Sequence, residues 1–189
     1  MRIIAGRWRG SRLPVIAAEG LRPTGDRIRE TLFNWLLGKL PGSRCLDLFA
    51  GSGALGFEAL SRGASHCDLV ELEATVVAQL RANQAQLDAA ATVHCCSAAS
   101  FIAHAEQREP IVPYQLVFLD PPFAGAFLPA VAEQLEQSGL LAEQSWIYAE
   151  LAAEQAFVAP DSWSLHRQRS SGGVSYRLYW RIADTATIA

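Results

Sequence analysis

The sequence predicts an α/β fold built on one mostly parallel, Rossmann-like β-sheet. Three observations lead to this prediction. From residue 44 onward, strand-like and helix-like segments alternate along the chain. The strand-like runs are almost continuously apolar, as in residues 115–119, which is typical of parallel strands covered on both faces. A glycine-rich loop, residues 51–56, follows the first of these strands.

The alternation gives the order of the predicted elements. Strands are expected at residues 44–49, 66–71, 92–96, 115–119 and 145–150, and helices at residues 53–62, 74–88, 98–107 and 127–138. The tail breaks this rhythm, because residues 163–169 and 175–181 are both β-like and a Ser/Gly-rich turn joins them. The sheet is therefore expected to end in an antiparallel pair of strands.

The N-terminal region reads as a small extension of this domain. With 189 residues, half of them apolar, the chain is long enough for one good core and short for two domains. We expect a hairpin extension at residues 1–20 and the main domain at residues 21–189. Residues 2–5 and 12–16 are the β-like arms of that hairpin, and Arg7, Trp8 and Arg9 lie at its tip.

These tip residues are candidates for RNA contacts. Two guanidinium groups beside an indole can pair with phosphates and stack on an unpaired base. The alternative is that Trp8 packs on the body of the protein and the arginines are merely solvated.

A helix is expected next, because apolar residues at positions 28, 32, 35, 36 and 40 form a helical stripe that Thr24 or Asp26 could cap. Arg22, Arg27 and Arg29 gather at its start and would favour an anion there. The alternative is internal pairing with Asp26 and Glu30.

Charge is distributed unevenly along the chain. Residues 1–45 hold nine Lys and Arg against three Asp and Glu, whereas residues 46–189 hold seven against sixteen. A basic N-terminal part on an acidic body suggests that the N-terminal part meets a polyanion.

The sequence shows no sign of a metal site or of a membrane segment. The four cysteines form no CxxC pair and have no ligand-like spacing with the histidines, so no metal is expected. Neither a signal peptide nor a membrane-spanning run is visible. Reduced, buried thiols in a cytoplasmic protein are the simplest interpretation.

Three acids follow predicted strands: Asp47, Glu71 and Asp120. In open α/β sheets, ligands bind beyond the carboxyl ends of the strands. Residues 51–56 match GxGxxG, and Glu71 is suitably placed to bond ribose hydroxyls. However, a carboxylate at Asp47 would repel the pyrophosphate of a dinucleotide. S-adenosylmethionine carries a sulfonium, an ammonium and no phosphate, so it would suit this acid better, although Asp47 could also brace the loop.

The motif Asp120-Pro121-Pro122-Phe123 follows the strand at residues 115–119 directly. The prolines stiffen the turn and leave its carbonyl groups free to accept hydrogen bonds. The Asp120 carboxylate and a proline carbonyl can both accept from one exocyclic NH2 group, while Phe123 stacks on the attached ring. The motif therefore predicts a receptor for an aminated base, which would have to be extruded if it were stacked. The alternative is a Pro-Pro loop with a capping Asp.

These motifs resemble those of class I S-adenosylmethionine-dependent methyltransferases, and more closely the bacterial small-subunit (16S) ribosomal RNA guanine-N2 methyltransferases. The resemblance covers nearly the whole chain and rests on residues 2–10, 21–36, 47–56 and 120–123. The glycine loop alone implies only a methyltransferase. The DPPF turn narrows the methyl acceptor to an exocyclic amine, and the motifs at residues 2–10 and 21–36 indicate this particular family.

The resemblance implies roles for individual residues. Asp47, Gly51, Ser52 and Gly53 would surround the methionine part of the cofactor, Glu71 would hold its ribose, and Asp120 with Phe123 would receive guanine. The remaining expected contacts are Phe49, Ala50, Leu72, Ser97 and Ala98 for the cofactor and Pro121 and Pro122 for the base. Ser97 stands where such enzymes often place an Asp that bonds the adenine amine.

The resulting hypothesis is a monomeric, cytoplasmic enzyme that methylates guanine N2 in small-subunit ribosomal RNA, within an assembling or assembled 30S particle. The nearest alternative is another nucleic-acid amine methyltransferase, acting on adenine N6 or on a different RNA guanine. Two further alternatives are a nicotinamide-dependent oxidoreductase, which Asp47 disfavours, and a non-catalytic RNA-binding module, which leaves the DPPF turn without a purpose.

Overall fold

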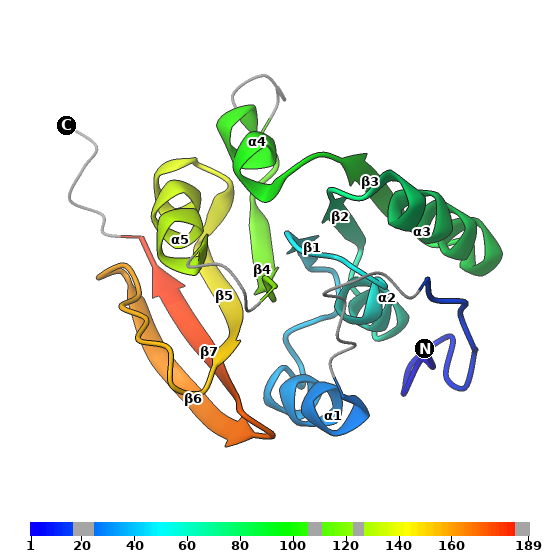
Figure 1. The fold of residues 1–189 in the computed structure, drawn as a ribbon, viewed down its shortest axis with the longest axis horizontal. Helices are drawn as coiled ribbons and strands as arrows, with labels where there is room; N and C mark the ends of the chain where they lie inside the picture. The colour runs from blue at the N-terminus through cyan, green and yellow to red at the C-terminus, as the bar shows by residue number, and fades with distance from the viewer. Residues whose placement is uncertain (17–24, 106–110, 123–126, 184–189) are drawn as a thin grey trace.

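A computed structural model describes residues 1–16, 25–105, 111–122 and 127–183 of the chain. Its centre is a seven-stranded sheet in the order β3-β2-β1-β4-β5-β7-β6, drawn in Figure 1. The predicted α/β class, with a mostly parallel sheet and an antiparallel C-terminal pair, is confirmed.

Five parallel strands form the larger part of the sheet: β1 (Arg44–Asp47), β2 (His66–Glu71), β3 (Ala91–Cys95), β4 (Tyr114–Leu119) and β5 (Leu141–Ala152). β5 begins four residues before its predicted start at 145. Its first residues lie beside the end of β7, where Gln144 is in register with Ile182. Leu141 is in register with Tyr114 of β4, so pairing on both sides extends the strand beyond the apolar run that predicted it.

The tail supplies β6 (Trp163–Ser171) and β7 (Val174–Ile182), which pair antiparallel as predicted. Gly172 and Gly173 join them and both have positive φ, which suits a tight hairpin turn. β7 inserts between β5 and β6, so β6 becomes the edge strand of the sheet.

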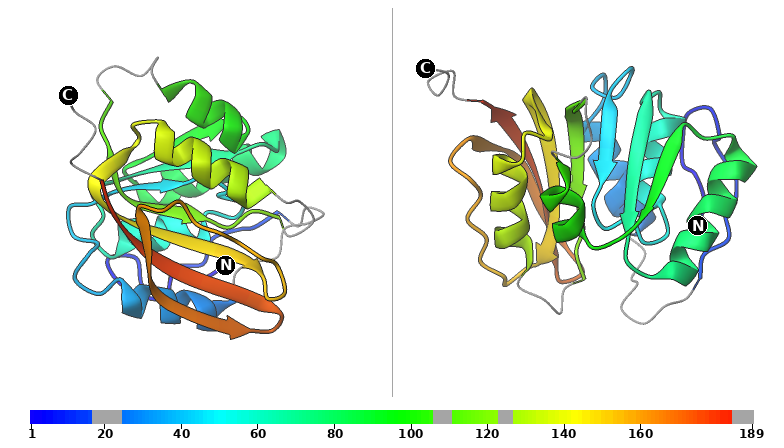
Figure 2. Two further views of the ribbon diagram at one scale, coloured as in Figure 1. Left: turned by 90° about the vertical axis from the view of Figure 1, so that its left-hand side faces the viewer. Right: turned by 90° about the horizontal axis from the view of Figure 1, so that it is seen from above.

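Helices cover both faces of the sheet, as Figure 2 shows. On one face, α1 (Asp26–Trp35), α2 (Ala54–Ser61) and α3 (Ala74–Leu87) form one apolar core with the strands. On the other face, α4 (Ala98–Ala103) and α5 (Phe127–Gln137) form a second core. α1 has Gly25 at its N-cap and no side-chain cap, so the predicted cap by Asp26 is wrong, and Thr24 lies outside the described residues.

The N-terminal segment, residues 1–16, folds back on itself as predicted, with backbone hydrogen bonds between residues 1–3 and residues 10–13. Its antiparallel pairing is shorter than the predicted arms at residues 2–5 and 12–16, with one β-bridge that joins Arg2 and Arg12. The segment packs on the main domain, because Ile3 and Leu13 are buried in its core. The predicted boundary between residues 20 and 21 lies outside the described residues.

Two buried contacts with α2 hold the N-terminal segment. Glu58, which is fully buried, accepts hydrogen bonds from the backbone N–H groups of Ile4 and Ala5 and pairs with Arg62. Gly6 has φ +82°, and a Cβ at this position would overlap the carbonyl oxygen of Ser61. The segment therefore docks only because a glycine allows the two backbones to come this close.

Candidate active site

The three predicted strand-end acids lie at neighbouring strand ends. Asp47 ends β1, Glu71 ends β2, and Asp120 directly follows β4. The strand order is β3-β2-β1-β4-β5. Strands β2 and β3 are added on one side of β1, and β4 and β5 are added on its other side, so the order reverses between β1 and β4. This is the position where open α/β sheets bind ligands.

The loop after β1 has a conformation that requires glycine. Gly51 and Gly53 have positive φ, at +49° and +77°. Side chains at Gly53 and Gly56 would collide with Phe57 and Leu69, respectively. The first two glycines thus shape the turn, and the third lets α2 lie close against β2.

Asp47 lies beneath this loop and is only 1% exposed. Its Oδ2 accepts a hydrogen bond from the backbone N–H of Gly56 at 3.2 Å, so the bracing role is real. Its Oδ1 has no hydrogen-bond partner among the described residues. Burial first, then the charges of Asp120 and Glu71, raise the pKa of Asp47 to about 7. A cationic ligand would relieve both the missing hydrogen bond and the charge repulsion.

Glu71 already uses both carboxylate oxygens. Oε2 accepts from the backbone N–H of Gly51 at 3.0 Å, and Oε1 accepts from that of Glu73 at 2.9 Å. The carboxylate thus links the end of β2 to the glycine loop on the next strand. Each oxygen keeps a further lone pair with which it can accept from a ligand hydroxyl.

The remaining predicted cofactor contacts lie around the same ends. Phe49 is half-buried and packs on the second core, Ala50 is buried, and Leu72 is 62% exposed. Ser97 is the N-cap of α4, because its hydroxyl accepts from the N–H of Ser100 at 3.1 Å, and Ala98 behind it is buried. Ser97 therefore has a structural task besides any contact with a ligand.

The turn after β4 places Asp120 half-buried, Pro121 buried and Pro122 exposed. Phe123 lies outside the described residues. Asp47 is in register with Phe118, two residues before Asp120, so the two carboxylates lie at adjacent strand ends.

A buried acid near the carboxyl end of β5 was missed by the sequence analysis. Glu150 is 3% exposed, and β5 carries it one residue beyond Ala149, which is in register with Leu119. It is thus level with Asp120 on the neighbouring strand and accepts a hydrogen bond from the Tyr148 hydroxyl at 2.6 Å. The criterion that found the other three acids would have found it too, because the predicted strand at 145–150 ends on this residue.

The N-terminal segment forms one wall of the site. A small cavity beside the glycine loop is lined by residues 14–16 together with Gly51, Ser52 and residues of α3. The side-chain amide of Asn83 on α3 donates to the carbonyl of Pro14 at 3.1 Å and holds this wall in place.

The predicted RNA-binding residues have different surroundings. Arg7, Arg9 and Arg27 are exposed, whereas Trp8 is half-buried against the first core. The expectation that Arg29 faces RNA is wrong. Its side chain is 1% exposed and donates to Asp26 and to the carbonyl of Arg2, as the alternative of internal pairing anticipated. Arg22 lies outside the described residues.

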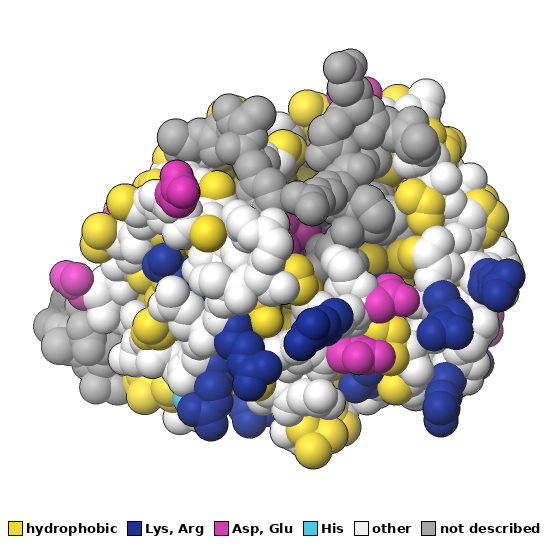
Figure 3. Space-filling view, turned by 60° about the horizontal axis from the view of Figure 1, so that its bottom comes forward, with side chains coloured by type: hydrophobic (Ala, Val, Ile, Leu, Met, Phe, Trp, Pro, Cys, Tyr) yellow, Lys and Arg dark blue, Asp and Glu magenta, His cyan; other side chains and the backbone are white. Residues whose placement is uncertain are grey.

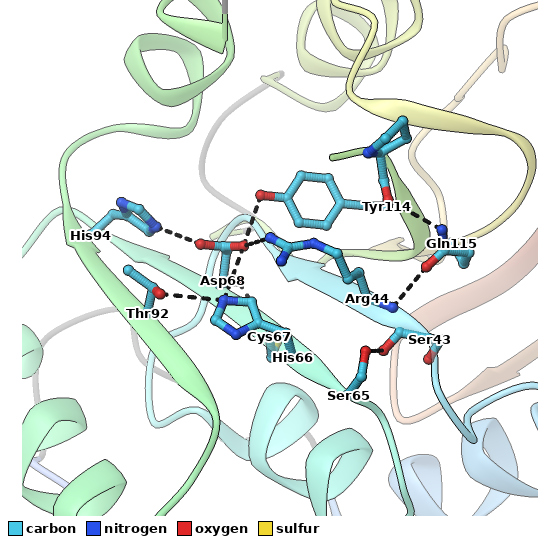
Figure 4. A network of polar contacts seen from close by, with 11 residues as sticks. Ser43, Arg44, Ser65, His66, Cys67, Asp68, Thr92, His94, Tyr114 and Gln115 are labelled. Carbon is cyan, nitrogen blue, oxygen red and sulfur yellow. Dashed lines mark hydrogen bonds and ion pairs between the residues drawn. The ribbon is translucent and has the colours of Figure 1, made fainter. Parts of the chain in front are cut away.

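A second polar network lies toward the opposite ends of the strands (Figure 4). Asp68 on β2 contacts Arg44 at 2.8 Å, His94 at 2.7 Å, the Tyr114 hydroxyl at 2.9 Å and His66 at 3.4 Å. Burial alone would raise the pKa of Asp68, but hydrogen bonds from both histidines and the tyrosine hold it well below the usual range. Arg44 is therefore another N-terminal cation that the fold uses internally.

Within the described part of the chain, no group of three or more His, Cys, Asp or Glu side chains is arranged to hold a metal ion. The four cysteines are free thiols, of which Cys45 and Cys67 are buried. None of the described helices has the length and apolar character that a membrane span needs.

Comparison with known proteins places the chain in a family. The family model described as conserved hypothetical protein 95 matches residues 1–180. A relative from Escherichia coli (strain K12), called ribosomal RNA small subunit methyltransferase D, is 48% identical over 186 residues, which cover 97% of this chain and 91% of the relative.

Solved structures share the fold. One, described as putative methyltransferase yhhF from Escherichia coli, is similar with a TM-score of 0.87 and 48% identity, and the match covers 97% of this chain and 99% of that chain. A more distant structure, SMU.776, is described as a putative methyltransferase complexed with SAH. It has a TM-score of 0.64 and 17% identity, over 85% of this chain and 50% of that chain, so the likeness is one of fold.

Proposed function

This chain belongs to the family described as conserved hypothetical protein 95, and we propose that it methylates small-subunit ribosomal RNA at N2 of a guanine with S-adenosylmethionine as donor. The name of the relative that is 48% identical supports ribosomal RNA as the substrate. The observation that carries the proposal is the position of Asp47 and Asp120 at the carboxyl ends of the paired strands β1 and β4, where the strand order reverses. One acid suits a cationic donor, and the other suits an amine acceptor.

The residues around the glycine loop fit S-adenosylmethionine. The buried Asp47 Oδ1 has no hydrogen-bond partner among the described residues and would accept from the cationic methionine part. Glu71 would accept from the ribose hydroxyls, and Ser97 and Ala98 would border the adenine. When bound, the cofactor supplies an electrophilic methyl group on a sulfonium.

Asp120 and the carbonyl of Pro121 would receive the guanine NH2 group, with Phe123 stacked on the ring. Both acceptors orient the nitrogen toward the methyl carbon. Their hydrogen bonds strengthen as the nitrogen becomes positive, so they stabilise the transition state more than the ground state. The surplus proton leaves to water, and no separate base is needed. We place this reaction in the cytoplasm, on a 30S particle, with the chain acting as a monomer.

Replacement of Asp120 tests this role. Asp120→Ala should lower kcat/KM by about a hundredfold or more, because it removes an acceptor that acts on developing charge. S-adenosylmethionine affinity, measured by calorimetry, should change little. Asp161→Ala, which removes an exposed acid in a turn before β6, is the control.

The substrates decide between the alternatives. Methyl transfer is measured on naked ribosomal RNA, on 30S particles and on DNA, with mass spectrometry of the modified nucleoside. N2-methylguanine in the RNA is expected. N6-methyladenine, or activity on DNA alone, would contradict the proposed base, and full activity of Asp120→Ala would contradict the proposed acceptor.

The raised pKa of Asp47 predicts that cofactor binding depends on pH. A cation favours the ionised carboxylate, and with a pKa of about 7 the ionised fraction grows between pH 6 and pH 8. S-adenosylmethionine affinity should therefore rise by roughly tenfold over this range. Calorimetry with Asp47→Asn as the comparison isolates this effect. An equal rise in the variant would show that another group titrates.

A further inference from the structure

A cationic surface lies along β6, the edge strand of the sheet. The count of charges along the sequence did not reveal it. Residues 164–171 of β6 are all exposed and include Arg167 and Arg169. In register, these two arginines lie opposite Leu178 and Tyr176, which belong to the first core, so both point to the face that α1 covers. Neither has an ion-pair partner among the described residues.

Aromatic side chains lie on the same face beside these arginines. Trp146 on β5 and Trp180 on β7 are in register, with ring centroids 4.5 Å apart, and both are half-buried. His166 packs edge-on against Trp146 at 5.0 Å, and Lys39 holds its ammonium 4.8 Å from the ring centroid of Trp146. Lys39 comes from the loop after α1, so sequence-distant cations meet here.

The chain segment that carries this surface is rich in arginine. Residues 163–183 contain four arginines and no Asp or Glu, in contrast to the acidic remainder of the main domain. The pKa of His166 is lowered by burial first and then by the charges of Arg167 and Lys39. In Figure 3, Lys and Arg side chains gather beside a histidine at the lower left of the molecule.

We propose that Lys39, Trp146, His166, Arg167, Arg169 and Trp180 form a second RNA-docking surface, which we call the β6 surface. The proposal rests on ribosomal RNA being the substrate. Guanidinium and ammonium groups beside half-buried indole rings match a phosphate backbone with unpaired bases. The surface binds RNA at a distance from the methylated base and so contributes to affinity and not to the chemical step.

A double variant, Arg167→Gln/Arg169→Gln, tests the β6 surface. The control is Leu165→Glu/Gln168→Glu, which makes the same change in net charge on the opposite face of the same strand. RNA affinity of the first variant should fall by about tenfold at low salt, and the slope of log K against log salt should decrease by about two. The control should keep the wild-type slope.

Methyl transfer separates docking from catalysis. The KM for RNA should rise in the Arg167→Gln/Arg169→Gln variant, while kcat, cofactor affinity and the melting temperature stay as in the wild type. Trp180→Ala should weaken RNA binding without a change in salt slope, because stacking releases no counterions.

Three outcomes would overturn the proposal. In the first, the arginine variant keeps wild-type RNA affinity. In the second, it binds naked RNA normally but loses affinity for 30S particles, which indicates a protein partner. In the third, it only self-associates, which indicates that the arginines protect an edge strand. Wild-type protein that neither binds nor methylates RNA would instead contradict the proposed function itself.

Discussion

The basic N-terminal region, residues 1–45 apart from Lys39, and the β6 surface are both cationic, but the fold treats their charges differently. At the N-terminal side, Arg29 is buried and Arg44 pairs with Asp68, while Arg7 and Arg9 stay exposed beside a tryptophan that packs on the core. On β6, both arginines are exposed, and two half-buried tryptophans lie beside them. The N-terminal side had the higher count of cations, yet several of them hold the structure together.

The comparison shows that a count of charges does not measure the charge available to a partner. A cation next to a buried carboxylate is neutralised locally and stabilises the fold. A cation on an edge strand without acidic neighbours keeps its field in solvent. If this difference is correct, variants of the N-terminal side should mainly change stability, and those of the β6 surface should mainly change RNA affinity.

The largest expected effect is at Gly6. Gly6→Ala introduces a Cβ that would overlap the Ser61 carbonyl, at a residue whose φ of +82° is already unfavourable for alanine. We expect a loss of roughly 3 kcal/mol in the free energy of unfolding. Chemical denaturation measures it, and hydrogen exchange should show residues 1–13 detached from α2.

Gly10→Ala is the matched control. Its φ is also positive, at +87°, but nothing lies within 4 Å of a Cβ there. It should cost only about 1 kcal/mol. Equal losses in the two variants would show that backbone strain, and not docking against α2, dominates at both positions.

A smaller effect is expected at Arg29. Arg29→Met keeps most of the buried volume but removes the contacts with Asp26 and the Arg2 carbonyl, so stability should fall by about 1 to 3 kcal/mol. Arg27→Met, on the exposed side of the same helix, should stay within about 0.5 kcal/mol of the wild type. If Arg29→Met is fully folded and still binds RNA more weakly than the wild type, then Arg29 contributes to RNA binding and is not only a structural cation.

The smallest effect concerns the tip of the N-terminal segment. Arg7→Ala/Arg9→Ala should weaken RNA binding by roughly threefold to fivefold and flatten the salt slope by less than two. The reason is that these two arginines lie beside a single tryptophan, whereas the β6 surface adds Lys39 and a second tryptophan. Salt-dependent binding measurements decide this, and a loss larger than that of the β6 pair would reverse the ranking of the two surfaces.

Most of the candidate site was predictable because it depends on local chain geometry. A strand followed by a glycine loop places Asp47 at the carboxyl end of that strand. The strands that follow in the sequence place Glu71 and Asp120 at the same end of the sheet. Glu150 obeys the same rule and was predictable too. The antiparallel pairing of residues 1–3 with residues 10–13 was predictable as well, whereas the contacts of this segment with α2 join distant parts of the chain.

The sequence by itself determined the order of the elements, the parallel sheet and the position of Asp47, Glu71 and Asp120 at the carboxyl ends of its strands. All of these follow from apolar periodicity and from where the strands end. Only the tertiary structure decided which cationic side chains remain available to contact RNA. Burial of Arg29, the pairing of Arg44 with Asp68 and the approach of Lys39 to Trp146 join residues from separate elements. The free energy of a charge depends on its solvent and its neighbours, and both are set by packing between elements distant in the chain.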